Sequence, residues 1–337
     1  MASAKHWDAQ LLEHHGHLLQ SWAWGEFKRG QGWEPERVDV SGPGGVGMAQ
    51  VLFRHRGPVS IGYIPRGPVM TGDREAIWPA LRAGIDRTAR RHRAISVIIE
   101  GDCAETLGAA CREGHLVPAD GAVQPLRTVK VPLLDDEPLL KQMHQKTRYN
   151  VRLAPRRGVT IAAVEPTPAN LAGFYALLRE TSARNDFLIH PERYYAGVLE
   201  AFGDDAALFQ AITAEGELAA ALIVARFGQE AIYLYGASST EHRSNGAGLA
   251  IQYEAMRWAR ERGATTYDLW GIPRQDPDST TTEDHAHIAG TSGKDWRGLY
   301  RFKTGFGGDI VAYPEAVERR YVPVLPALAR RLGFIPG

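Results

Sequence analysis

The spacing of apolar residues in the first half of the chain predicts a mixed α/β module. Alternating stretches at 34–40 and 47–56 flank the glycine-rich turn 41–45 and predict an antiparallel hairpin. A third strand is predicted at 58–69, and the continuous apolar run 94–102 is typical of a strand that is buried on both faces. The other predicted elements are helices before residue 30, near 74–93 and at 103–112, and a strand at 127–133.

The second half repeats this order of elements. Its predicted elements are a strand at 159–165, helices near 170–183 and 191–202, a hairpin of 208–214 with 218–227, a strand at 231–238, a helix at 248–262 and a strand at 266–272. We therefore predict an α/β (mixed α+β) fold with two copies of one module. Domain 1 is expected at residues 1–140, domain 2 at 141–309, and a C-terminal segment, 310–337, is expected to return to domain 1. The polar segment Pro273–Arg297 is predicted to be a loop, and it is either a lid or a plain surface insertion.

Composition narrows the class of protein. Apolar residues make up 44% of the chain and charged residues 23%, which is typical of a folded protein, and a formal net charge of zero argues against a wholly basic nucleic-acid binder. The two cysteines, Cys103 and Cys111, are too few for a disulfide framework or a zinc ligand set, so we expect free thiols and a cytoplasmic location. The apolar and arginine-bearing C-terminus is expected to form a short helix on its own domain. Peripheral contact with the inner face of the plasma membrane is the alternative.

A basic stretch without acidic residues runs from 141 to 158. Its cations include Lys146, Arg148 and Arg152. Residues 141, 144, 148 and 152 recur at helical spacing, which predicts that His144 shares one helix face with three cations. Because a solvated helix face normally intersperses acids, we interpret this stretch as a phosphate-binding surface rather than a plain surface helix.

A glycine-bracketed lysine stands near the end of the second module. In the stretch Gly298–Gly308 a strand-like period of two would place Tyr300 and Phe302 on one face and Arg301 and Lys303 on the other. Glycines on both sides allow a sharp turn and a close approach by another molecule. The stretch alone is equally consistent with a surface turn and with a lysine at the wall of a cleft.

These motifs together resemble the Fem-type (FemABX) aminoacyltransferases. The resemblance rests on QSWAWGEFK, KTRYNVRLAPRRGV, YLYGASS, IQYEAMRWARERGATTYDLWGI and GLYRFKTGFGG, which occur in this order along nearly the whole chain. It implies two tandem GNAT-like domains, no coiled-coil arm and no cofactor. The implied reaction moves glycine, alanine or serine from aminoacyl-tRNA to the side-chain amine of residue 3 of a peptidoglycan precursor. The precursor is either lipid II or UDP-MurNAc-pentapeptide, and the enzyme is expected to be a monomer.

The resemblance also implies roles for individual residues. Lys303 matches a lysine that stabilises the transition state, and Lys28 matches one that binds the precursor phosphates. His190 stands where the family has a phosphate-binding arginine, with Arg184 and Arg193 as possible replacements. The other implied substrate-binding residues are Tyr194, Tyr233, Tyr235 and Phe302. Arg243 begins a segment ending at Gly248 that resembles the pyrophosphate loop of GNAT-fold acetyltransferases, so we group it with the phosphate-binding residues.

Aminolysis of an ester needs an oxyanion donor and a proton acceptor. Lys303 is our candidate for the donor. Glu100, Asp102 and Asp268 are candidate bases, but each is more readily explained as a structural residue, and substrate or solvent is the alternative proton acceptor. No metal site is expected. The alternatives are an acyl-coenzyme A dependent N-acetyltransferase, a tRNA-dependent enzyme that modifies a small peptide, and a precursor-binding protein without activity.

Overall fold

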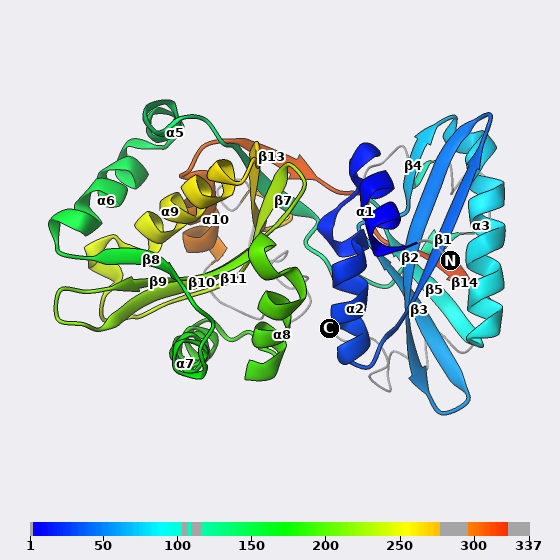
Figure 1. Cartoon of the computed structure of the whole chain (residues 1–337), viewed down its shortest axis with the longest axis horizontal. Coiled ribbons are helices and arrows are strands. Elements are labelled where there is room, and N and C mark those ends of the chain that lie inside the picture. Colours follow the sequence, from blue (N-terminus) through cyan, green and yellow to red (C-terminus); the bar gives the residue numbers. More distant parts are fainter. Residues whose placement is uncertain (1–2, 103–106, 109–115, 277–295, 323–337) are drawn as a thin grey trace. The chain divides into compact units, whose positions relative to one another are not determined.

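The computed structural model describes residues 3–102, 107–108, 116–276 and 296–322, and divides into two compact units. Unit 1 comprises residues 1–126 and the segment from Tyr313 onward, and unit 2 comprises Arg127–Ala312 (Figure 1). The strand at 127–132, which we expected in domain 1, therefore belongs to unit 2. The reason is its pairing, because it forms hydrogen bonds with two strands of the second sheet and none with the first.

Unit 1 is built on a sheet with the strand order β1-β2-β3-β5-β14-β6, and β4 also pairs with β2. Its strands are β1 Glu34–Gly42, β2 Gly45–Arg56, β3 Val59–Pro65, β4 Val69–Gly72, β5 Ala94–Glu100, β6 Val117–Pro118 and β14 Val317–Arg320. Its helices are α1 Ala4–Glu13, η1 Leu18–Gln20, α2 Trp22–Gly30 and α3 Arg74–Arg91. The predicted single strand 58–69 is two strands, separated by a turn that contains the cis peptide Gly67-Pro68.

Helix α3 covers one face of the unit 1 sheet. Asp73 caps its N-terminus by accepting hydrogen bonds from the backbone N–H groups of Glu75 and Ala76. Its apolar side, which includes Trp78 and Leu81, packs against inward residues of β1, β2 and β5. Helices α1 and α2 lie on the opposite face (Figure 1). Both faces of this sheet are therefore buried, which explains the nearly continuous apolar sequence of β2 and β5.

Unit 2 has a sheet with the strand order β13-β7-β12-β11-β10-β9-β8. Its strands are β7 Arg127–Pro132, β8 Thr160–Val164, β9 Ala206–Ile212, β10 Leu218–Phe227, β11 Glu230–Ser238, β12 Thr266–Gly271 and β13 Asp309–Ala312. Its helices are α5 Asp136–Gln142, α6 Gln145–Arg156, α7 Pro168–Asn185, α8 Glu192–Phe202, η2 Gly203–Asp205, η3 Arg243–Asn245, α9 Ala247–Glu261 and α10 Trp296–Thr304.

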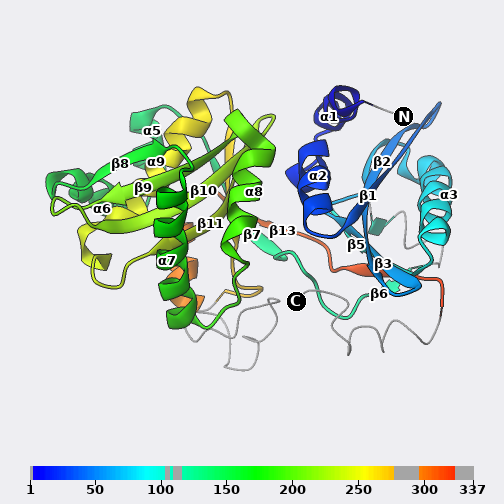
Figure 2. The same ribbon diagram turned by 60° about the horizontal axis from the view of Figure 1, so that its bottom comes forward.

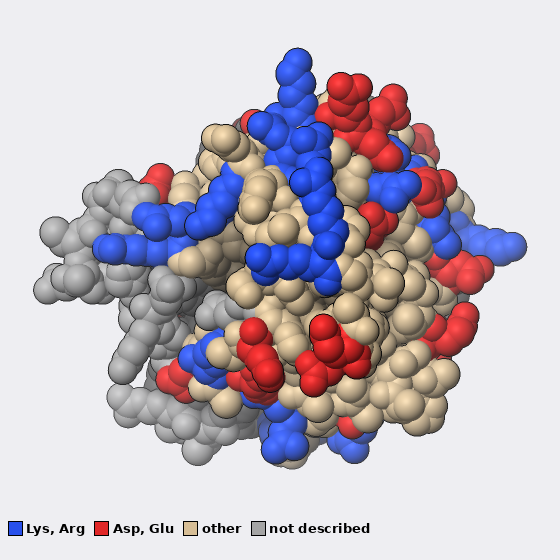
Figure 3. All heavy atoms as spheres, turned by 90° about the vertical axis from the view of Figure 1, so that its left-hand side faces the viewer, with Lys and Arg blue, Asp and Glu red and all other residues tan. Residues whose placement is uncertain are grey.

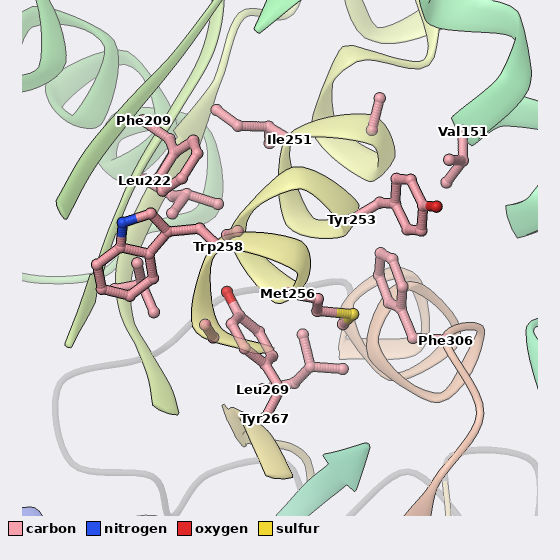
Figure 4. Close-up of a cluster of buried hydrophobic side chains, with 14 of the residues drawn as sticks. Val151, Phe209, Leu222, Ile251, Tyr253, Met256, Trp258, Tyr267, Leu269 and Phe306 are labelled. Carbon is pink, nitrogen blue, oxygen red and sulfur yellow. The ribbon is translucent and has the colours of Figure 1, made fainter. Parts of the chain in front are cut away.

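Helices cover both faces of the unit 2 sheet. Figure 2 shows α7 and α8 over one face, while α6 and α9 lie over the other. The buried side of α9 carries Met256 and Trp258, which pack against strand residues such as Phe209 and against Phe306 beyond α10 (Figure 4). This cluster fixes the end of α10 to the core of the unit.

The stretch that we expected to be strand-like is helix α10. Lys303 is buried in its last turn, the helix ends at Thr304, and the buried Phe306 lies in the turn that follows. A Cβ on Gly305 would lie 2.4 Å from Thr147 Oγ1, and the Gly305 carbonyl accepts a hydrogen bond from the backbone N–H of His144 at 2.9 Å. The strand prediction for this stretch was wrong because a short aromatic window fits both periods.

Some predictions fall outside the described residues. These are the free thiols of Cys103 and Cys111, most of the candidate lid at 273–297 and most of the C-terminal helix. Within the described part, no helix has the length and apolarity that a membrane crossing requires. The longest described helices, α3 and α7, have 18 residues, too few for three heptads.

Candidate active site

Two parallel strands of unit 2 separate and open a gap in the sheet. β11 pairs with β12 over three positions only, and the last pair is Ile232 with Asp268. Immediately after this point β11 contains a bulge, because Tyr233 pairs with Val224 and Tyr235 with Ile223, which leaves Leu234 unpaired. Beyond Ile232 and Asp268 the two strands therefore share no backbone pairing.

Lys303 reaches the separated strands from α10. Its side chain is buried, with 6% of the residue exposed, and its Nζ donates a hydrogen bond to the Gly271 carbonyl at 2.7 Å. The same ammonium lies 5.6 Å from the centre of the Tyr233 ring. Burial lowers the pKa of Lys303 to about 7, and the nearby Asp268 carboxylate partly opposes this shift. The lysine therefore changes its charge near neutral pH.

Asp268 anchors the strand end that faces Lys303. Its Oδ1 accepts hydrogen bonds from the Thr128 hydroxyl and, at 2.6 Å, from the backbone N–H of Trp270. Trp270 has φ of 63°, a left-handed conformation that is uncommon for a tryptophan, and β12 loses register with β7 between Asp268 and Gly271. The irregular strand end thus presents the Gly271 carbonyl to Lys303.

The three candidate bases lie in different places. Asp268 is fully buried and is the one that interacts with Lys303. Glu100 lies in unit 1, at the end of β5, where it accepts hydrogen bonds from the Tyr63 hydroxyl and the backbone N–H groups of Val123 and Gln124. Burial raises the pKa of Glu100. Asp102 follows Glu100 in the same unit.

The bulge in β11 sends Tyr233 and Tyr235 to different neighbours. Tyr233 packs with the α9 side of the sheet beside Lys303, and burial raises its pKa to about 12. A Cβ on Gly236 would lie 2.0 Å from the Tyr233 hydroxyl, so glycine is needed there. Tyr235 instead meets Tyr195 edge to face at 4.9 Å. Of the two tyrosines that the sequence left open, Tyr233 is the one beside Lys303.

Tyr235 belongs to an aromatic group on the α8 side. Tyr194 meets Tyr235 edge to face at 6.2 Å, and the His190 ring stacks on Tyr194 with centroids 3.8 Å apart. The Tyr195 hydroxyl accepts a hydrogen bond from the backbone N–H of His190 at 3.0 Å. The structure thus brings together Tyr194, Tyr235 and His190, which were predicted separately. Their roles in substrate binding stay predictions.

Two other predicted substrate residues serve the fold. Arg184 donates to the Thr240 hydroxyl at 2.6 Å and to the Ser238 carbonyl at 3.1 Å, which ties α7 to the segment after β11. Phe302 is half-buried and meets Phe306 edge to face at 5.7 Å. Both residues therefore have a structural explanation.

The basic stretch is two helices, so the prediction of one continuous cationic face was wrong. α5 ends at Gln142 and His144 is the N-cap of α6, while Arg148 donates to the carbonyls of Lys141 and Met143 and thereby caps α5. The exposed stripe of α6 carries Tyr149, Arg152 and Arg156, with Lys146 beside it. Figure 3 faces the end of unit 2 where α6 lies and shows Lys and Arg side chains gathered there, with acidic side chains mostly outside the group.

The segment after Arg243 packs against α6. Gly246 has φ of 83°, and a Cβ there would lie 2.5 Å from the Asn150 carbonyl. The Asn245 side chain accepts from the backbone N–H of Ala247 at 2.9 Å, and Arg157 donates to the Ser244 carbonyl at 2.9 Å. Glycine at 246 is therefore explained by turn geometry and close packing, without an anion. The side chain of Arg243 lies outside what the structure describes.

Lys28 lies at the end of α2 in unit 1. Its Nζ is 5.1 Å from the Trp24 ring and 5.8 Å from the Phe27 ring, so the side chain lies along an aromatic surface. The residue is partly buried.

Sequence reasoning missed several members of the group around Lys303. The Gly271 carbonyl, Thr128 and Gln252, whose amide oxygen accepts from Tyr267 at 2.9 Å, carry no motif of their own. Their roles depend on where strands end and cross, which periodicity does not report.

Comparisons with known proteins agree with the repeated architecture. Residues 3–109 match the FemAB family model, and residues 141–278 match a model described as an acetyltransferase (GNAT) domain. A lipid II:glycine glycyltransferase of Staphylococcus aureus is 27% identical, over 89% of this chain and 87% of its own length.

Solved structures share the fold. FemX superposes with a TM-score of 0.82 at 24% identity, over 97% of this chain and 98% of its own. A tandem GNAT protein from the clavulanic acid biosynthesis pathway superposes with a TM-score of 0.53 at 13% identity, over 86% and 83%. The fold is thus two tandem GNAT-like domains.

Proposed function

The chain belongs to the Fem-type (FemABX) family and is an acyltransferase, and from this premise we propose that it builds peptidoglycan bridges. In the proposed reaction it moves glycine, alanine or serine from aminoacyl-tRNA to the side-chain amine of residue 3 of a peptidoglycan precursor. The similar Staphylococcus aureus enzyme is named for glycyl transfer to lipid II, which supports a precursor of this class as the acceptor.

The observation that carries the proposal is the buried Lys303 amine at the separated β11 and β12 strands. In the proposed step the neutral acceptor amine attacks the ester carbonyl carbon, and a C–N bond forms. The carbonyl oxygen becomes an oxyanion, and protonated Lys303 stabilises it. Collapse breaks the bond to the tRNA 3′ oxygen, which leaves with a proton, while the amine nitrogen loses one. A preorganised donor of this kind lowers the activation free energy by about 3–4 kcal/mol.

The basic stripe of α6 is our proposal for the tRNA contact. Lys146 and Arg152 are exposed on this helix, and the N-cap residue of the helix donates to Gly305 at the end of α10. Tyr149 on the same helix has 60% of its surface exposed. The cations can contact the tRNA phosphates, and the tyrosine ring can stack on an unpaired base at the end of the tRNA. Lys28 is our proposal for the contact with a phosphate of the precursor, because its ammonium lies beside two aromatic rings on the surface of unit 1.

The test is a transfer assay with a panel of charged tRNAs and two acceptors, lipid II in detergent and soluble UDP-MurNAc-pentapeptide, read by mass spectrometry. We expect one added amino acid on residue 3 of one acceptor. A small peptide with a free lysine amine is the third acceptor in the assay. Modification of that peptide alone would indicate an enzyme that modifies small peptides and would contradict the proposed acceptor. Preference for lipid II would support contact with the membrane surface.

Acetyl-coenzyme A forms the control donor. The segment at Gly246 packs on α6 and its first helical N–H is capped by Asn245, which leaves less of this helix start for a pyrophosphate. We therefore expect no acetyl transfer. Acetylation of any of the acceptors without tRNA would contradict the proposed donor.

A further inference from the structure

Three side chains that are far apart in the sequence converge at one end of the unit 1 sheet. Glu34 begins β1, His55 lies near the end of β2 and His92 follows the last residue of α3. Glu34 pairs with Phe53 in the β1–β2 register, so Glu34 and His55 project from the same face of the sheet, the face that α3 covers. The three ligand-type side chains therefore meet where this helix ends.

The three potential ligand atoms form a nearly equilateral triangle. His55 Nε2 lies 3.2 Å from His92 Nδ1, while Glu34 Oε2 lies 3.5 Å from His55 Nε2 and 3.4 Å from His92 Nδ1. A tetrahedral zinc site with bonds of about 2.0–2.1 Å has ligand-to-ligand edges of about 3.3 Å. The spacing is thus that of three corners of a tetrahedron around one ion.

The ring of His92 is fixed with the required nitrogen facing the triangle. It stacks on Phe53 with centroids 4.3 Å apart and planes within 2°, and the Ser60 hydroxyl donates to its backbone carbonyl at 2.8 Å. Its Nε2 lies 2.8 Å from Glu36 Oε1, so that nitrogen donates to the carboxylate, and in the neutral ring this leaves the lone pair on Nδ1, which faces the triangle. A carboxylate behind a ligating histidine is the usual arrangement in zinc sites.

The Glu36 carboxylate behind His92 is itself paired with an arginine. Arg91 contacts Glu36 Oε2 at 2.7 Å, which balances the charge of Glu36 and orients it toward His92. The triangle remains open to solvent, since the Glu34 side chain is 56% exposed and the His55 side chain 37%. An ion can therefore enter, and the fourth position faces water.

We propose that Glu34, His55 and His92 bind one divalent transition metal ion, with zinc as the best match, and that Glu36 positions His92. Two imidazoles and one carboxylate favour zinc over calcium or magnesium, which take oxygen ligands. No motif spacing indicates this site, because its ligands come from two strands and a helix end. The site lies within unit 1 and is independent of the proposed transfer reaction.

The experiment is calorimetric titration of the chelator-treated full chain with zinc chloride. We expect one tight site per chain, and His55→Ala is expected to weaken binding more than about 100-fold, beyond the 10–100-fold that a second-shell change costs. Glu36→Gln is expected to fall within that smaller range. His242→Ala is the matched control and should leave binding unchanged, because His242 also pairs with a carboxylate, Glu217 at 2.9 Å, in unit 2.

A second readout guards against variants that misfold. Without metal, the His55→Ala protein should melt at the wild-type temperature, and zinc should raise the melting temperature of the wild type but not that of His55→Ala. Cobalt(II) should give the intense visible absorbance of a four-coordinate site in the wild type. Equal zinc affinity in wild type and His55→Ala, or no binding by the wild type, would show that hydrogen bonds alone hold the three side chains together and would overturn the proposal.

Discussion

Each unit contains one parallel strand pair joined by a helix, and the two pairs differ in how far they stay hydrogen-bonded. In unit 1, β3 and β5 stay paired over six positions, from Ser60 with Ala94 to Pro65 with Glu100. In unit 2, β11 and β12 stay paired for three positions and then part. In each unit the pair follows antiparallel strands and is joined by a crossover helix, α3 or α9.

The buried acids differ in the same way. Glu100 of unit 1 accepts from a tyrosine hydroxyl and two backbone N–H groups, so its carboxylate is occupied by the protein. Asp268 of unit 2 faces a buried lysine whose pKa is near 7. One fold thus has a closed copy in which polar groups stabilise the structure, and an open copy in which they remain chemically responsive. Perturbed groups of the second kind are typical of active sites.

The largest expected effect is the loss of Lys303 from the open copy. Lys303→Met should fold and lose aminoacyl transfer by a factor of 100 or more, about 3 kcal/mol, because the oxyanion loses its donor. The measurement is single-turnover transfer from charged tRNA. Arg301→Met, which removes an exposed cation from the same helix, is the control. Near-normal transfer by a folded Lys303→Met protein would remove Lys303 from the mechanism.

The same substitution should stabilise the protein. The folded lysine has a pKa of about 7 instead of 10.5, so between these values the unfolded chain binds a proton that the folded chain does not. The contribution of Lys303 to the free energy of unfolding therefore becomes more favourable from pH 7 to about pH 10. Below pH 7 the buried ammonium destabilises the folded state the most. After allowing for the Gly271 carbonyl that loses its donor, we expect Lys303→Met to gain about 2 kcal/mol at pH 7 in urea unfolding, and less at pH 10. A loss of stability at pH 7 would contradict the burial cost.

The comparison is also tested by a substitution in unit 1. Tyr63→Phe removes the hydroxyl that donates to buried Glu100 and should lower the free energy of unfolding by about 2 kcal/mol. Transfer per folded molecule should stay at the wild-type rate. Tyr233→Phe is the matched change in unit 2, beside Lys303, and should alter transfer more than stability. Equal effects of the two variants on transfer would break the distinction between the copies.

Asp268→Asn should change the pH dependence of transfer. The protonated fraction of Lys303 falls above pH 7 while the neutral fraction of the acceptor amine rises until about pH 10, so the wild-type rate should rise to pH 7 and then level off. Without the Asp268 charge the lysine pKa falls further, and the break should move to lower pH with a rate at pH 7 about tenfold lower. The measurement is the transfer rate from pH 5.5 to 9, and an unchanged break would separate Asp268 from Lys303.

The smallest expected effect concerns α6. Lys146→Ala with Arg152→Ala should raise the KM for charged tRNA a few-fold and lower the slope of log affinity against log salt by about 1–2, with little change in kcat. Arg87→Ala on α3, an exposed arginine of unit 1, is the control. An unchanged salt slope would exclude α6 as the tRNA contact.

The order of elements could be predicted from the sequence, but the chemistry at strand ends could not. The hairpin at residues 34–56 and the repeat in the second half are confirmed, because each depends on local periodicity. The separation of β11 from β12 depends on a bulge at Leu234 and on the left-handed Trp270, which no periodicity announces. The carbonyl partners of Arg148 and Arg184 could not be predicted for the same reason, since only tertiary structure brings them near.

The return of the chain to unit 1 has a consequence for the order of folding. β14 lies between β5 and β6, and Asp86 on α3 holds it through Arg319 at 3.1 Å and Tyr321 at 2.6 Å. The ribosome makes this strand only after all of unit 2, at about 5–20 residues per second. Until then β5 has an unpaired edge of backbone N–H and C=O groups, a surface that invites mispairing. The unit that begins synthesis first is thus the unit that finishes folding last, and unit 2 is the natural partner to fold in the interval.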